Sequence, residues 1–147
     1  LVVAAAGNGG TLGGSLLTRH PWVLPVAACD RRGRPFGASN LGASIGRRGL
    51  AAPGEAVTSL GTDGRPLTLA GTSFAAPFVT GAAALLLSLF QAASAADLKL
   101  ALTRPGVRRR SVVPPLLDAR AAHQFLTGTH SPRRNVHGND RYRRTGC

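Results

Sequence analysis

One stretch of the sequence constrains the fold more than any other, namely residues 71–87, GTSFAAPFVTGAAALLL. After a glycine turn it continues as nearly unbroken apolar helix formers, which predicts a buried helix over residues 74–90. Pro77, Thr80 and Gly81 interrupt the run. A run of this length with these interruptions favours a core helix over a bilayer span, so no membrane partner is expected.

The chain upstream of this helix has the pattern of a buried sheet. Small apolar residues fill 1–6 and 23–29, which is typical of parallel strands covered on both faces. After the second run, DRRGRP predicts a tight connection, and residues 36–39 are expected to form another short strand. The pattern indicates an α/β fold with a mostly parallel sheet.

The elements on either side of the long helix are a hairpin and two shorter helices. Segments 56–60 and 67–70 flank TDGRP, whose Asp-Gly pair predicts a hairpin that delivers the chain to Gly71. Beyond the long helix, a second helix is expected around 97–102, stopped by a Pro-Gly pair, and a third begins near Asp118.

Charge divides the chain into a packed part and a basic tail. Residues 1–103 carry 8 basic and 4 acidic side chains, whereas residues 104–147 carry 10 and 2. We expect one domain over 1–126 and a solvated or disordered extension over 127–147. An Arg-rich tail can bind nucleic acid, but only Tyr142 lies among these arginines, so nucleic acid is not the expected partner. The two cysteines form no spaced framework, and the compartment stays unassigned.

Ser73 lies at the predicted start of a helix, a position that can favour a nucleophilic hydroxyl. At an N-cap or in a first turn it lies among unpaired backbone amides at the positive end of the helix dipole. A nucleophile there attacks a carbonyl while its own N–H helps to hold the developing oxyanion. If Phe74 is the first helical residue, Pro77 falls at the fourth position, where its missing N–H costs little. The alternative is an ordinary capping serine.

Several motifs together resemble one protein family. GTSFAAPFVTGAAALL resembles the nucleophile motif of the subtilisin-like serine proteases, and VVAAAGNGG resembles the strand and turn that carry their oxyanion asparagine. LPVAACDRRGRPFGASNLG, LAAPGEAV and PPLLDARAAHQFL are similar to further segments of the family, so the resemblance covers residues 1–126. It implies a partial subtilisin-like fold, with a mostly parallel sheet and a buried central helix starting at the nucleophile serine.

The resemblance also implies an activity, which is endopeptidase cleavage of peptides or proteins. Ser73 would form the acyl-enzyme, and Asn8, 65 residues earlier, would hold the oxyanion together with the Ser73 amide. A side-chain amide at the carboxyl end of a strand suits that role, although Asn-Gly is also an ordinary tight turn. GNGGTLGG lacks the spacing of a phosphate-binding loop. Five further residues are expected to contact the substrate: Ala5, Ala6, Gly7, Gly71 and Thr72.

The general base is the missing part of this interpretation. In this family the catalytic residues occur along the sequence in the order Asp, His, Ser, so the Asp and the His would both precede the asparagine turn. His20, His123, His130 and His137 stand in none of the family's histidine settings. Since the sequence also opens on LVVAAA without methionine, we expect a fragment that needs an upstream segment carrying Asp and His, and that is inactive alone.

Other interpretations remain open. The chain could be a non-catalytic remnant or scaffold, or a basic nucleic-acid-binding module. No cofactor is required, but Asp30 follows VAAC where some family members hold a calcium or monovalent cation. The simpler alternative is a turn aspartate beside two arginines. The Phe74 variant and the LLLSLF continuation faintly resemble bacterial subtilases that trim ribosomally made peptides.

Overall fold

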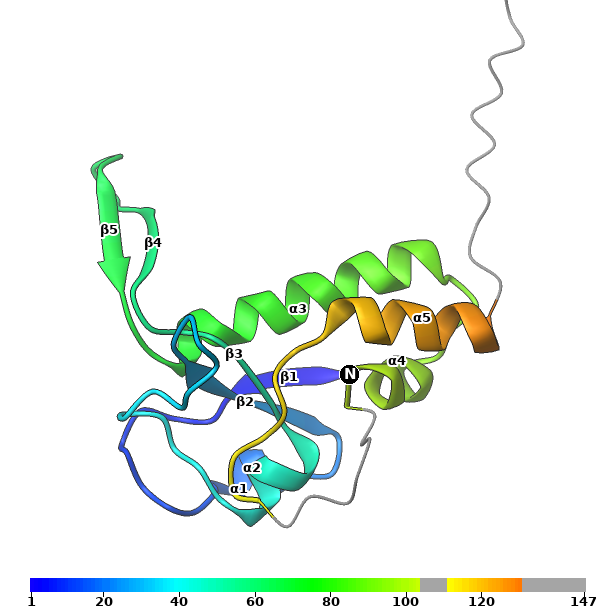
Figure 1. Cartoon of the computed structure of the whole chain (residues 1–147), viewed down its shortest axis with the longest axis horizontal. Coiled ribbons are helices and arrows are strands. Elements are labelled where there is room, and N and C mark those ends of the chain that lie inside the picture. The colour runs from blue at the N-terminus through cyan, green and yellow to red at the C-terminus, as the bar shows by residue number, and fades with distance from the viewer. Residues whose placement is uncertain (104–110, 131–147) are drawn as a thin grey trace, which may run out of the picture.

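A computed structural model describes residues 1–103 and 111–130 of the chain and confirms the α/β class. Three parallel strands form one sheet in the order β1-β2-β3, where β1 is Val2–Ala5, β2 is Val23–Cys29 and β3 is Leu50–Pro53 (Figure 1). The first two strands were predicted. In the register of the sheet, Ala5 and Leu50 both lie opposite Val26.

The central strand β2 is buried along its whole length because both of its faces are covered. Leu24, Val26 and Ala28 belong to the main core with α3, whereas Ala27 packs with Ile45 in a smaller cluster on the other face. This explains why β2 reads as a continuous apolar run and not as an alternating one.

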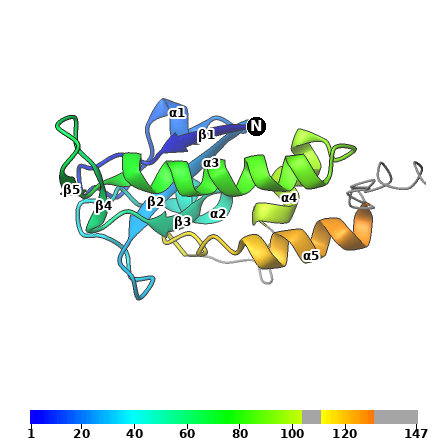
Figure 2. The ribbon, with the colours of Figure 1, turned by 90° about the horizontal axis from the view of Figure 1, so that it is seen from above.

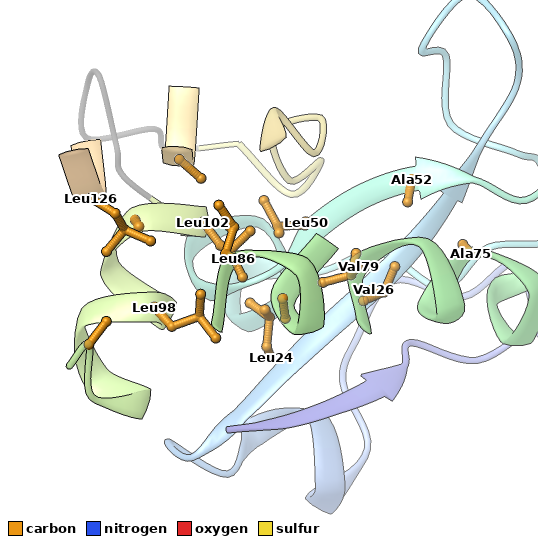
Figure 3. Packing of buried hydrophobic residues seen from close by; sticks show 14 of the residues in the cluster. Leu24, Val26, Leu50, Ala52, Ala75, Val79, Leu86, Leu98, Leu102 and Leu126 are labelled. Carbon is orange, nitrogen blue, oxygen red and sulfur yellow. The ribbon is translucent and has the colours of Figure 1, made fainter. Parts of the chain in front are cut away.

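The long helix α3 spans Thr72–Leu89 and lies across one face of the sheet (Figures 1 and 2). Its buried residues recur every three or four positions, which places them on one stripe facing the sheet (Figure 3). They are Thr72, Ala75, Val79, Ala83 and Leu86. Within the described residues, α3 is also the helix whose length and composition suffice to cross a membrane, a test that core helices pass as well.

In the part of the chain that the structure describes, four further helices pack around this core. α1 (Leu16–Arg19) and α2 (Ala43–Arg48) lie on the face of the sheet opposite α3 (Figure 1). α4 (Ala95–Thr103) and α5 (Ala119–Thr129) pack together at the far end of α3, and the sequence predicted both helices at these positions of the chain.

The end of α5 shows where the packed part of the chain stops within the described residues. Leu126 is fully buried in the main core, and the helix continues to Thr129, three residues beyond the expected end of the packed part. The rest of the tail, 131–147, lies outside the described residues.

The hairpin was predicted correctly and stands away from the body of the molecule (Figure 1). β4 (Val57–Leu60) pairs antiparallel with β5 (Pro66–Leu69), which ends just before α3 begins.

One sequence-based expectation about the sheet was wrong, and one strand was missed. Residues 36–39 form no strand, because Ser39 N–H donates to the Phe36 carbonyl and closes a turn. β3 was not foreseen and lies in LAAPGEAV, a segment that was matched to the family without being assigned to a strand. The helix begins at Thr72, after an N-cap at Gly71, so Ser73 lies in its first turn, which is one of the two positions expected for it.

Candidate functional site

The N-terminus of α3 is attached to the carboxyl edge of the sheet by backbone hydrogen bonds. Gly54, which follows β3, donates its N–H to the carbonyl of Cys29 at the end of β2 (3.0 Å). The carbonyl of Gly54 in turn accepts from Gly71 N–H (2.7 Å). Ser73, the second residue of the helix, is thereby placed with an exposed side chain at the edge where parallel sheets bind ligands.

Asn8 reaches the same place from the turn after β1. Its Oδ1 accepts hydrogen bonds from Thr72 N (2.8 Å) and from Thr72 Oγ1 (3.0 Å). Its Nδ2 lies so close to Gly71 that a Cβ added there would sit 3.0 Å away. The structure therefore brings the Asn8 amide beside the residues that immediately precede Ser73, although 65 residues separate Asn8 from Ser73 in sequence.

Thr72 is the link between the turn and the helix. Its side chain is completely buried, and Oγ1 accepts from Gly7 N–H (3.1 Å) while donating to Asn8 Oδ1. The hydroxyl is thus used internally, and contact of Thr72 with a substrate stays a prediction. The other expected wall residues occupy the end of β1 and the turn, where Ala6 is buried and Ala5 and Gly7 are half-buried.

Two donors at this location have no acceptor among the described residues. They are the Asn8 Nδ2 group and the Ser73 backbone N–H, and the Ser73 hydroxyl likewise makes no hydrogen bond within the described part of the chain. Unused donors at the positive end of a long helix favour a negatively charged oxygen there. The arrangement can hold an oxyanion next to a nucleophilic hydroxyl.

Pro77 has a different place in the helix from the one expected. Because α3 starts at Thr72, Pro77 is its sixth residue, where an N–H would normally bond the Ser73 carbonyl. That carbonyl receives no helical bond from position 77. The missing bond falls on the residue that carries the candidate nucleophile, and the expected position of Pro77 among the first four helical residues was wrong.

No histidine in the described ranges lies beside Ser73. The His123 ring packs edge-on against Phe90, 5.3 Å between centroids, and Phe90 lies about 25 Å along α3 from Ser73. His130 pairs with Asp97 at 3.5 Å, and His20 caps the short helix α1. The fourth histidine, at position 137, is outside the described residues.

Asp30 is held by donors from its own turn. Oδ1 accepts from the backbone N–H of Arg32 (2.8 Å) and Arg34 (2.9 Å), and Oδ2 accepts from Arg34 Nε (2.7 Å). The backbone hydrogen bond from Arg34 is the largest cause that lowers the pKa of this carboxyl. Residues 1–103 and 111–130 contain no group of three His, Cys, Asp or Glu able to hold a metal. The cation site therefore stays a prediction.

Sequence reasoning missed one residue next to this site, Asn40, whose side chain lies against the turn that carries Asn8. The available signal was the Ser-Asn pair in FGASNLG, which was matched to the family only as part of a segment.

Sequence comparisons relate the chain to known proteins. The model of the Subtilase family matches residues 1–120. A thermostable alkaline protease of Halalkalibacterium halodurans is 41% identical over 61% of this chain and 24% of its own length. Subtilisin DY of Bacillus licheniformis is 37% identical over 67% of this chain and 36% of its own.

Solved structures give the same result for the fold. The self-cleaved protease domain of PatA superimposes with a TM-score of 0.74 at 33% identity, and covers 84% of this chain. The prenylagaramide maturation protease PagA gives 0.76 at 34% identity and covers 87%. The chain spans about half of each of these structures, 49% and 50%. Because the family model matches most of this chain, the chain belongs to the Subtilase family, and it has part of the subtilisin-like fold.

Proposed function

We propose that the chain carries the nucleophile and the oxyanion site of a subtilisin-type serine endopeptidase. The observation that carries this proposal is the meeting of Asn8 with the first turn of α3, recorded by the 2.8 Å bond from Thr72 N–H to Asn8 Oδ1. This bond fixes Oδ1 on the helix and leaves Nδ2 free to donate. The exposed Ser73 hydroxyl lies one residue further along.

The reaction follows from these positions. Ser73 Oγ attacks the acyl carbon of a peptide bond and gives its proton to a general base, and the carbonyl oxygen becomes an anion. Asn8 Nδ2 and Ser73 N–H donate to that oxygen. Collapse of the intermediate breaks the C–N bond, the amine leaves with the proton returned by the base, and water later hydrolyses the ester on Ser73.

The general base belongs to a segment outside the described residues. Two observations support this part of the proposal: the three described histidines are engaged elsewhere, and the chain spans only about half of the matched structures. The segment we propose carries the Asp and the His and lies upstream, which makes the chain by itself inactive or weakly active.

The substrate is a peptide or a protein. The solved relatives include proteins named as patellamide and prenylagaramide maturation proteases. This favours a precursor peptide as the first substrate to test, beside an unfolded protein such as casein.

Covalent labelling tests the proposal. The polypeptide that includes the upstream segment is incubated with a peptidyl phosphonate, and the adduct is located by mass spectrometry. We expect one adduct, on Ser73, which Ser73→Ala abolishes and Ser88→Ala on the same helix leaves intact. Upstream Asp and His motifs without an adduct would contradict the endopeptidase and support the non-catalytic remnant.

A further inference from the structure

The turn that carries Asn8 is built on a side chain from another part of the chain. Asn40 Oδ1 accepts from the backbone N–H of Gly9 (2.9 Å) and Thr11 (3.2 Å), and also from Thr11 Oγ1 (3.2 Å). On the other side of Asn8, Asn40 Nδ2 donates to the carbonyl of Ala6 (3.3 Å). One amide therefore bonds the turn both before and after Asn8.

Backbone hydrogen bonds hold the segment around Asn40 against this turn. Its own N–H donates to the Gly7 carbonyl (2.8 Å), and Gly10 N–H donates to the carbonyl of Ala38 (2.8 Å). The preceding residue, Ser39, is buried, and its Oγ accepts from Ala28 N–H in the central strand (3.1 Å). The segment around Asn40 is thus fastened to the sheet and can act as a fixed support.

The glycines that flank Asn8 leave the room that the Asn40 side chain needs. A Cβ at Gly7 would collide with Asn40 Nδ2, and one at Gly9 would lie 3.3 Å from Asn40 Oδ1. Gly7 also has a φ of 106°, which other residues rarely adopt. No hydrogen bond joins Asn40 to Asn8 within the described residues, so Asn40 acts on Asn8 through the turn.

We propose that Asn40 is a positioning residue for the oxyanion site, fixing Asn8 Nδ2 relative to Ser73 by clamping the intervening turn. The inference rests on the proposed function for its catalytic consequence, but its structural part stands independently. Asn40 touches neither Ser73 nor, in our proposal, the substrate. Its removal lowers the rate of the chemical step and leaves the binding of the probe nearly unchanged.

Two variants of Asn40 separate its hydrogen bonds from its volume. Asn40→Leu keeps a similar size and removes every side-chain bond, whereas Asn40→Asp keeps the acceptor oxygen for Gly9 and Thr11 but replaces the donor to Ala6 by a charged carboxylate oxygen. Ser94→Ala is the matched control, because Ser94 caps α4 at the far end of α3, where its Oγ accepts a hydrogen bond from Asp97 N–H. If Asn40→Leu does not fold, Asn40→Ser replaces it, since its shorter hydroxyl cannot span the same contacts.

The first readout is nuclear magnetic resonance of the ¹⁵N-labelled polypeptide that includes the upstream segment, and it needs no activity. We expect Asn40→Leu to shift the signals of the Asn8 side-chain amide and of the Thr72 backbone amide. Asn40→Asp should shift them less and Ser94→Ala not at all. Unmoved signals in a folded Asn40→Leu or Asn40→Ser variant would overturn the proposal.

The second readout is the rate of phosphonate labelling of Ser73 at several probe concentrations, in the polypeptide with the upstream segment. We expect Asn40→Leu to lower the maximal rate about tenfold with little change in half-saturation, and Asn40→Asp to recover most of the loss. Labelling of Asn40→Leu at the wild-type rate would refute the positioning role and leave the proposed function intact. Absence of labelling in the wild type, with shifted signals in the first readout, would refute the endopeptidase and keep the structural clamp.

Discussion

Replacement of Thr72 by valine tests how the site is held together, because the substitution removes a hydroxyl and keeps the shape. Oγ1 is buried, donates to Asn8 and accepts from Gly7 N–H. Each lost hydrogen bond costs about 1 kcal/mol, and the added methyl group returns part of this through apolar burial. We expect Thr72→Val to lower the free energy of unfolding by about 1.5 kcal/mol, or Tm by about 6 °C for a domain of this size.

The assay is urea unfolding followed by circular dichroism, with Thr80→Val as the control. Thr80 lies on the same helix, is exposed, and bonds only the Ala76 carbonyl (3.1 Å), so its replacement should change stability by less than about 0.5 kcal/mol. Equal midpoints for the two variants would refute the conclusion that Thr72 ties the asparagine turn to the helix. We predict that only Thr72→Val lowers the free energy of unfolding, and that the same variant labels Ser73 more slowly.

Three further predictions concern the backbone, the pH response and solubility. Gly71→Ala should destabilise the chain by about 1–3 kcal/mol in thermal unfolding, since φ is 146° and the new Cβ would approach Asn8 Nδ2; a neutral effect would contradict this. Hydrogen bonds from the Ser94 side chain and backbone are the main causes that lower the pKa of Asp97. The contribution of this carboxylate to the free energy of unfolding is therefore complete above the ordinary pKa of 3.8 and is lost as pH falls through the lower folded pKa. Asp97→Asn should therefore destabilise at pH 7 and match wild type at the lowest pH; a constant difference would argue against it. Exposed apolar side chains such as Leu16 (88%) and Trp22 (72%), together with the edge of β1 that pairs with no strand in the described residues, predict aggregation in light scattering, and a clean monomer would contradict that.

The sequence was sufficient for elements whose pattern is local. The apolar stripe of α3, the Asp-Gly hairpin and the doubly covered strand β2 each follow from short-range spacing. The convergence of Asn8 with Ser73 was inferred from a family resemblance, because no local pattern joins residues so far apart.

What escaped prediction depends on partners distant in sequence. β3 consists of LAAP, whose alanines have little β-propensity, and it becomes a strand only because β2 supplies the pairing. The segment 36–39 fails as a strand because Ser39 N–H donates to the Phe36 carbonyl and closes a turn, which leaves the Ser39 hydroxyl to accept the Ala28 N–H. Asn40 stood only inside a segment matched to the family, and its contacts on both sides of Asn8 become visible only when the turn after β1 is placed against it.

The proposed chemistry requires that the Ser73 hydroxyl and the Asn8 amide serve one developing anion. Asn8→Ala should accordingly slow labelling by about a hundredfold, the magnitude found when the oxyanion asparagine of a subtilisin is removed. A crystal structure of the phosphonate adduct on Ser73 measures the arrangement itself. We predict a phosphonyl oxygen at about 2.7–3.1 Å from both Asn8 Nδ2 and Ser73 N. An adduct whose oxygen points to solvent, with the Asn8 amide turned away, would contradict the shared oxyanion site.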